Sequence, residues 1–118
     1  MPANQHEAIH HPLSLHISTQ DGATVVQCRG KLTAGVTDIL HDKVKALIPH
    51  NARIVLDLTD LTQMDSLGLG TIVGLYVSAK TAGCRLELIN LSKRIRDLFR
   101  MTNLLTLFDP GCYITKMH

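Results

Sequence analysis

An aspartate and a serine directly before a glycine-containing run have the clearest chemical potential in this sequence. The run 66–80 (SLGLGTIVGLYVSAK) is apolar almost throughout, which predicts a buried helix that begins near Ser66. A serine at a helix start can cap free backbone N–H groups. It can also accept a phosphoryl group, because a helix N-terminus favours negative charge and presents it at a surface. The residues alone leave both roles open.

The same predicted helix carries three glycines, Gly68, Gly70 and Gly74. Each glycine costs the helix about 1 kcal/mol relative to alanine, so we expect a compensating close contact. Gly70 and Gly74 are four residues apart and share one helical face. This spacing predicts close approach of that face either to the sheet or to a binding partner.

Two enzyme classes that use glycine-rich motifs are not supported by the spacing. An α/β-hydrolase elbow needs Gly-x-Ser-x-Gly, but Met64 occupies the first glycine position, and the only histidine after Ser66 is His118. A phosphate-binding GxxxxGK[ST] loop is also missing from the sequence. We therefore predict that the protein is not an enzyme, with no catalytic residue and no cofactor.

The histidines near the amino end do not form a recognisable metal site. His6, His10, His11 and His16 lack ordered spacing and have no cysteine or carboxylate partners at ligand spacing. We predict no metal, and we interpret residues 1–12 as a disordered tail. Residues 13–118 are then a single domain, as the length of 118 residues indicates.

Composition excludes several further classes. Apolar residues make up 45% of the chain and charged residues 19%, which predicts a folded core. A net charge of +2 does not favour nucleic acid, and no apolar run is long enough to span a membrane. The amino end lacks the layout of a secretory signal, so we expect a cytoplasmic protein.

The three cysteines, Cys28, Cys84 and Cys112, lie in or beside apolar stretches, which predicts reduced thiols.

Hydrophobic periodicity predicts alternating strands and helices. Alternation from Leu13 to Cys28 around an Asp-Gly turn indicates a hairpin. From Thr33 onward an apolar stripe indicates a helix that Pro49 ends, and residues 53–58 read as a central strand, followed by a turn-like segment, Thr59 to Met64.

The second half of the chain continues this order. Residues 84–89 are a predicted strand, and Ser92 is predicted to cap a helix with Ile95, Leu98 and Phe99 facing inward. We interpret the basic residues Lys93, Arg94, Arg96 and Arg100 as the side of the helix that faces water. For Lys93, Arg96 and Arg100, which share one helical face, an acidic partner is a secondary interpretation. Short apolar pieces at 104–108 and 112–115 suggest a last strand and an extension. The order predicts an α/β fold with a single-layer mixed sheet of four to five strands.

Residues 13–108 resemble the STAS domain, named for sulfate transporters and anti-sigma factor antagonists. The matching segments are 54–58 (IVLDL), 64–70 (MDSLGLG), 82–88 (AGCRLEL) and 95–105 (IRDLFRMTNLL). In length the chain is similar to the free-standing anti-sigma factor antagonists of bacteria. The resemblance implies a small mixed sheet with helices mainly on one face, in agreement with the element order.

The resemblance also implies a function. In the family, the serine after the aspartate of the D-S-[ST]-G-L-G signature is phosphorylated by a partner kinase, and Ser66 holds that position. The unphosphorylated form binds an anti-sigma factor that is often itself the serine kinase, and a serine phosphatase restores it. The alternative is a constitutive STAS subunit of a transporter ATPase complex or of a stress-sensing scaffold. Self-association is left open.

Two departures from the family pattern concern the expected partner surface. Leu67 replaces the second serine or threonine of the signature, and Thr33 replaces the aspartate of a G-x-L-D pattern. The expected partner-facing surface combines the start of the predicted helix with a nearby loop. Its residues are Leu32, Thr33, Ala34, Gly35, Asp65, Ser66, Leu67, Gly68, Leu69, Ile72 and Val73.

Overall fold

The chain opens with a β-hairpin. The structure, a computed structural model, describes residues 12–102 and 113–114. Strand β1 (Leu13–Gln20) pairs antiparallel with β2 (Ala23–Leu32). Asp21 and Gly22 join them with φ angles of 53° and 80°, the left-handed backbone that a tight hairpin turn requires. The predicted hairpin is confirmed.

The five strands form one mixed sheet in chain order. β2 pairs parallel with β3, β3 with β4, and β4 with β5, so only the hairpin is antiparallel. This confirms the predicted α/β class and mixed sheet. The later strands are β3 (Arg53–Met64), β4 (Arg85–Ile89) and β5 (Tyr113–Ile114).

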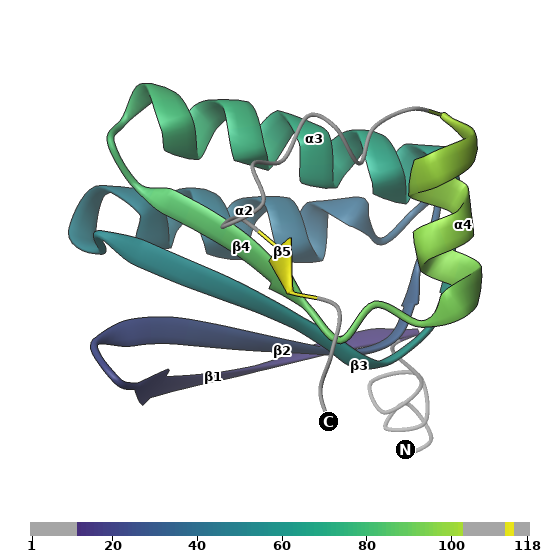
Figure 1. Ribbon diagram of the computed structural model, residues 1–118, viewed down its shortest axis with the longest axis horizontal. Coiled ribbons are helices and arrows are strands. Elements are labelled where there is room, and N and C mark those ends of the chain that lie inside the picture. Colours follow the sequence, from purple (N-terminus) through teal and green to yellow (C-terminus); the bar gives the residue numbers. More distant parts are fainter. Residues whose placement is uncertain (1–11, 103–112, 115–118) are drawn as a thin grey trace, which may run out of the picture.

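Helices α2 (Thr37–Leu47) and α3 (Ser66–Thr81) cover one face of the sheet, as Figure 1 shows. Each connects two neighbouring parallel strands, which places it across the sheet. Pro49 lies in a short 3-10 helix (Ile48–His50) directly after α2, so the predicted stop is confirmed. Helix α4 (Lys93–Met101) stands at the end of the sheet where α3 begins.

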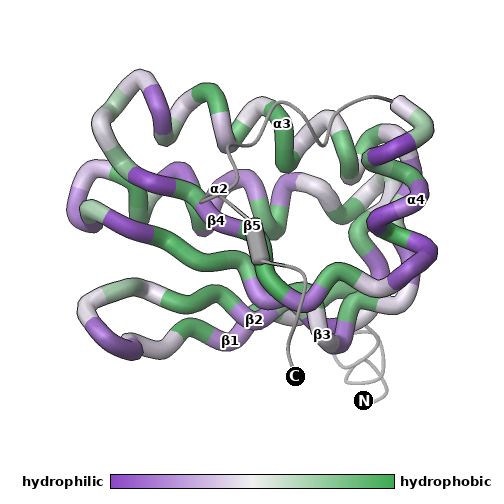
Figure 2. Tube along the Cα trace, in the orientation of Figure 1, coloured by the Kyte–Doolittle hydropathy of each residue, from purple (hydrophilic) through white to green (hydrophobic). Residues whose placement is uncertain are grey.

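The main core lies between the sheet and helices α2 and α3. Leu56 and Leu88 from the strands and Val44, Ile72 and Leu75 from the helices are fully buried in it. Figure 2 shows the hydrophobic colouring along the facing strands and helices. Burial of this many aliphatic side chains supplies the main driving force for folding.

The opposite face of the sheet holds a buried charge. Glu87 is 4% exposed, and its carboxylate accepts hydrogen bonds from Arg53 (2.9 and 3.1 Å) and from Arg85 (2.6 Å). The hydrogen bonds that Arg53 donates to Glu87 also raise the pKa of the Arg53 guanidinium. The pair of arginines satisfies the carboxylate, which would otherwise be costly to bury.

Strand β3 is longer than the sequence predicts. The segment Thr59 to Met64, expected as a turn, continues the strand and pairs with β2 as far as Leu32. Its side chains are mostly polar and exposed, so periodicity does not reveal it. The pairing with β2 has two register shifts, each with an extra residue in β3, and Leu61 is buried between them. The turn prediction is wrong.

Other predictions have mixed outcomes. Ser92 caps α4 by accepting a hydrogen bond from the Ile95 N–H (3.2 Å), as predicted. Cys28 and Cys84 are buried free thiols, and burial raises the pKa of Cys28 to about 12. In the described part of the chain, no helix is long and apolar enough to cross a membrane. The expected tail (apart from Pro12), Cys112 and the piece 104–108 lie outside the described residues.

Candidate functional site

Asp65, and not Ser66, caps α3. The Asp65 Oδ1 atom accepts hydrogen bonds from the backbone N–H groups of Leu67 (3.0 Å) and Gly68 (2.9 Å). Ser66 is the first residue of the helix itself. The capping interpretation of Ser66 is therefore wrong, because the extended backbone of Asp65 places its carboxylate at the free N–H groups.

The same carboxylate fixes the loop between β2 and α2. Its Oδ2 atom accepts a hydrogen bond from the Ala34 N–H at 2.9 Å, and the Asp65 N–H donates to the Leu32 carbonyl at 3.3 Å. Parallel strands bring their carboxyl ends to one edge of a sheet, so the β2–α2 loop and the start of α3 are neighbours there. One side chain thus joins the two segments of the expected partner surface.

Gly68 provides the close approach that the glycine pattern predicts. A Cβ atom added at Gly68 would overlap the backbone carbonyl oxygen of Leu32. At Gly70 and Gly74, an added Cβ would meet no atom of the described residues within 4 Å beyond the neighbouring backbone of α3. The expected close contact at Gly70 and Gly74 is therefore not found with the sheet or helices of this chain, and the tight contact is between the first turn of α3 and the end of β2.

The Ser66 hydroxyl is open to solvent. Ser66 is exposed, and within the described residues its side chain has no hydrogen-bond partner. The neighbouring Leu67 side chain is 59% exposed, an unusual degree for a large apolar residue. The Thr71 hydroxyl donates to the Leu67 carbonyl at 2.9 Å, which fixes the backbone of this turn. A free hydroxyl and an apolar side chain therefore stand together on a rigid helical turn.

Several residues of the expected partner surface belong to the core. Leu32 and Ile72 are 0% exposed and Leu69 is 4% exposed, so their side chains cannot meet a partner. Gly68 is also buried, and Val73 is half-buried. The prediction is corrected for Gly68, Leu69 and Ile72, because α3 turns its apolar face to the sheet. It is also corrected for Leu32, because this residue ends β2 and packs against the first turn of α3. The accessible part consists of Thr33, Ala34, Gly35, Asp65, Ser66 and Leu67.

The local field at Ser66 is set by Asp65 and by the helix. Hydrogen bonds from the N–H groups of Gly68 and Ala34 lower the pKa of the Asp65 carboxyl below its usual value of 3.8. The carboxylate therefore stays ionised at neutral pH and neutralises part of the positive helix end. A second anion on Ser66 would stand next to this charge.

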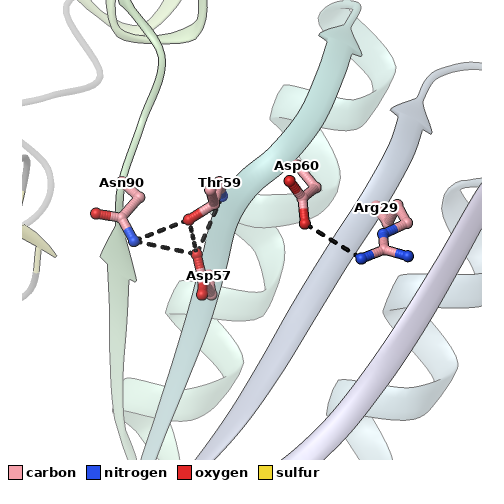
Figure 3. A network of polar contacts seen from close by, with 5 residues as sticks. All are labelled: Arg29, Asp57, Thr59, Asp60 and Asn90. Atoms are coloured by element: carbon pink, nitrogen blue, oxygen red, sulfur yellow. Dashed lines mark hydrogen bonds and ion pairs between the residues drawn. The ribbon is translucent and has the colours of Figure 1, made fainter. Parts of the chain in front are cut away.

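A second polar network, which the sequence does not reveal, lies at the carboxyl end of β4, beside the middle of β3. Figure 3 shows Asn90, at the end of β4, pointing to Asp57 and Thr59 on β3. The Asn90 amide donates to the Thr59 hydroxyl (2.9 Å) and to the Asp57 carboxylate (3.3 Å), which also accepts from the Thr59 N–H (3.0 Å). Asn90 has a φ of 60°. The network fixes the turn from β4 toward α4.

Beside this network, Arg29 and Asp60 form an ion pair across β2 and β3 at 3.5 Å, also drawn in Figure 3. Both side chains are largely exposed, so the pair contributes little to stability. Within the described residues no group of three or more His, Cys, Asp or Glu side chains gathers as a metal site would.

Comparison with known proteins assigns the family. The family model described as the STAS domain matches residues 14–116, most of the chain. The chain belongs to the STAS domain family. A relative in Bacillus subtilis (strain 168), the anti-sigma-B factor antagonist, is 30% identical over 97 residues, which cover 82% of this chain and 89% of that protein.

Solved structures give the same fold for this STAS domain. An anti-sigma factor antagonist from Mycobacterium paratuberculosis has a TM-score of 0.76 at 18% identity and covers 89% of this chain and 86% of its own. The Bacillus cell fate determinant SpoIIAA in its phosphorylated form has a TM-score of 0.68 at 18% identity, with coverage of 89% and 93%. A sulfate transporter family protein from Wolinella succinogenes has a TM-score of 0.66 at 14% identity, with coverage of 82% and 80%. At these identities the likeness concerns the fold alone.

Proposed function

We propose that this STAS domain is an anti-sigma factor antagonist, a protein-binding switch controlled by phosphorylation of Ser66. In its unphosphorylated form it sequesters an anti-sigma factor that has serine kinase activity, and so regulates transcription in the cytoplasm. A serine phosphatase returns the phosphorylated form to the binding state. The exposed, unpartnered Ser66 hydroxyl on the first turn of α3 is the observation that carries the proposal. The protein acts by binding and not as an enzyme.

The geometry at Ser66 suits phosphoryl transfer. The hydroxyl is exposed, and the Asp65 cap holds the backbone around it in one conformation. The Ser66 oxygen attacks the terminal phosphorus of ATP, an O–P bond forms, and the bond to the ADP oxygen breaks. The hydroxyl proton passes to a base of the kinase. The product phosphate lies at a helix N-terminus, where an anion is tolerated.

Charge explains how the phosphate would release the partner. Phosphoserine adds about −1.5 to −2 charges beside Asp65. A dianion about 6 Å from a partner carboxylate costs roughly 1–5 kcal/mol for effective dielectric constants from about 80 to 20, before salt screening. Every 1.4 kcal/mol or so is a tenfold change in affinity. The switch needs no refolding, since Ser66 is already on the surface.

Intact-mass analysis after incubation with the cognate kinase and ATP tests the phosphorylation site. We expect one phosphoryl group on the wild-type chain and none on Ser66→Ala. The matched control is Ser18→Ala, since Ser18 is exposed on β1 and lies outside the site. Ser18→Ala should be phosphorylated like the wild type. An unmodified wild-type chain, or a phosphoryl group that persists in Ser66→Ala, would refute the assignment.

The second candidate is a constitutive STAS subunit of a transporter ATPase complex or of a stress-sensing scaffold. The 59% exposure of Leu67, where the family signature has a serine or threonine, favours it, because an exposed leucine suits a permanent apolar contact. The Ser66→Asp variant separates the two. The switch predicts that Ser66→Asp loses partner binding, whereas the permanent subunit predicts little change in a pull-down.

A further inference from the structure

A groove next to the Ser66 surface lies between the end of β3 and α4. It encloses about 580 Å³, and its apolar wall consists of Met64, Ile95, Leu98 and Met101. Met64 stands two residues before Ser66, and Figure 1 shows α4 at the end of the molecule where α3 begins. The Met101 side chain is 79% exposed and Ile95 is buried at 1%. The groove is therefore an apolar channel with an exposed methionine at its rim.

The rim of this groove is basic. Helix α4 has four basic side chains and one acidic one, Asp97, and Figure 2 shows hydrophilic segments interrupting the hydrophobic ones along it. Asp97 is shared between Lys93 (3.0 Å) and Arg100 (3.2 Å). Arg94 also lines the groove, is exposed, and has no ion pair or hydrogen bond within the described residues. The rim thus keeps an excess of positive charge that the chain itself does not neutralise.

We propose that this groove binds an acidic amphipathic helix of a protein partner. An apolar channel of this kind accepts the apolar face of a helix, with anchors at i, i+3, i+4 and i+7. Acidic side chains beside that face would meet the unneutralised charge of Arg94 at the rim, which gives electrostatic complementarity. Methionine walls adapt readily to such a ligand.

The proposal rests on the proposed function only in its choice of partner, the anti-sigma factor that contacts Ser66. An acidic helix in this groove would lie beside Ser66, so a phosphate there would repel it. A membrane surface is a poorer fit, because the apolar residues line a pocket and only Met101 among them is largely exposed. The groove therefore predicts a partner segment that is apolar on one face and acidic on its flanks.

Methyl NMR of the full chain labelled at methionine tests the groove without the partner. The probe is a synthetic helix with leucines at i, i+3, i+4 and i+7 and glutamates elsewhere. We expect the Met64 and Met101 methyl signals to shift on titration and the effect to weaken between about 0.05 and 0.5 M salt. The matched peptide with lysine in place of glutamate should cause no such shifts.

Two charge-reversal variants locate the acidic contact. Arg94→Glu removes an exposed rim charge, and Lys43→Glu makes the same charge change on α2, outside the groove. We expect about fivefold weaker binding of the glutamate peptide to Arg94→Glu, and a change of less than about twofold for Lys43→Glu. Equal effects of the two variants would overturn the proposal.

Other outcomes would also contradict it. Unshifted Met64 and Met101 signals, or equal shifts with the lysine peptide, would exclude an acidic helix. Shifts that appear without peptide as protein concentration rises would assign the groove to a second copy of this chain. Shifts caused by phosphatidylglycerol vesicles and not by the glutamate peptide would assign it to a membrane. Because none of these readouts uses Ser66, failure of the groove and failure of the phosphorylation switch are distinguishable.

Discussion

At the scale of single residues, the Asp65 carboxylate unites two segments that are 31 positions apart in the chain. One oxygen caps α3 through Leu67 and Gly68, and the other holds Ala34 in the β2–α2 loop. All three donors are backbone groups, so the arrangement does not depend on which side chains surround it. Ser66 and the loop beside it are therefore positioned by one residue.

Two substitutions of Asp65 distinguish the contribution of its hydrogen bonds to stability from that of its charge. Asp65→Ala removes the cap and the contact to Ala34, and we expect the Tm to fall by roughly 3–6 °C. Asp65→Asn keeps a capping oxygen, so its Tm should fall less than that of Asp65→Ala. Thermal unfolding by circular dichroism at neutral pH measures both. An Asp65→Ala protein as stable as the wild type would contradict the role of Asp65 as cap and clamp.

The pH dependence of stability in the wild type and in Asp65→Asn is a second test of the role of Asp65. The folded-state pKa of Asp65 is lowered, chiefly by the Gly68 N–H, so its ionised form stabilises the fold. That contribution is fully present above the unfolded-state pKa near 3.8 and is lost as the pH falls through the lower folded-state pKa. Unfolding in acid should therefore be less pH-dependent for Asp65→Asn than for the wild type. Identical acid profiles would show that the charge contributes nothing.

At this scale the sequence predicts the site but not its geometry. The Asp65-Ser66 pair identifies a helix start, yet either residue satisfies the preference for a small polar cap. The choice depends on the extended backbone of Asp65, which the pairing of β3 with β2 determines. Asn90 likewise gives no signal in the sequence, because its role requires Asp57 and Thr59 on another strand.

At the scale of elements, the contact between α3 and the end of β2 sets where the helix begins. Gly68 lies directly against the Leu32 carbonyl, whereas Gly70, two residues later, faces open space. The same change from glycine to alanine therefore has opposite steric consequences at two positions in one helix turn. This contrast makes the pair a sensitive probe of how closely α3 packs on the sheet.

We expect Gly68→Ala and Gly70→Ala to change stability in opposite directions. Alanine favours a helix by up to about 1 kcal/mol over glycine, so Gly70→Ala should raise the free energy of unfolding by about 0.5–1 kcal/mol. At Gly68 the added methyl meets a backbone oxygen that cannot rotate away. Overpacking in Gly68→Ala should therefore lower the free energy of unfolding by about 1–3 kcal/mol. Urea unfolding measures both, and equal stabilities would contradict the close contact.

The sequence predicts well those helices and strands that have long or periodic apolar stretches. It does not predict segments that are strands only because they hydrogen-bond to a neighbouring strand. The helix expected at 66–80 is observed as Ser66–Thr81, because its length and apolar character leave little alternative. The second half of β3 escapes prediction because Thr59, Asp60, Thr62 and Gln63 are polar and exposed. Only hydrogen bonding to β2 makes that segment a strand.

At the scale of the whole molecule, the parallel strands bring the elements of the candidate site to one end. The β2–α2 loop, the start of α3 and the turn before α4 all follow carboxyl ends of neighbouring strands. Family resemblance predicts this architecture and the serine position. It does not settle which residues of the expected partner surface are buried: an apolar residue such as Leu69 or Ile72 is individually more often core than interface, but only the placement of α3 on the sheet assigns it.

In the proposed switch, charge on Ser66 controls partner binding without a change of fold. Isothermal titration of the cognate anti-sigma factor with the unphosphorylated chain and with the chain phosphorylated on Ser66 tests this claim most directly. We predict that the phosphorylated chain binds at least about tenfold more weakly, while its circular dichroism spectrum is unchanged. Equal affinities of the two forms would contradict the account.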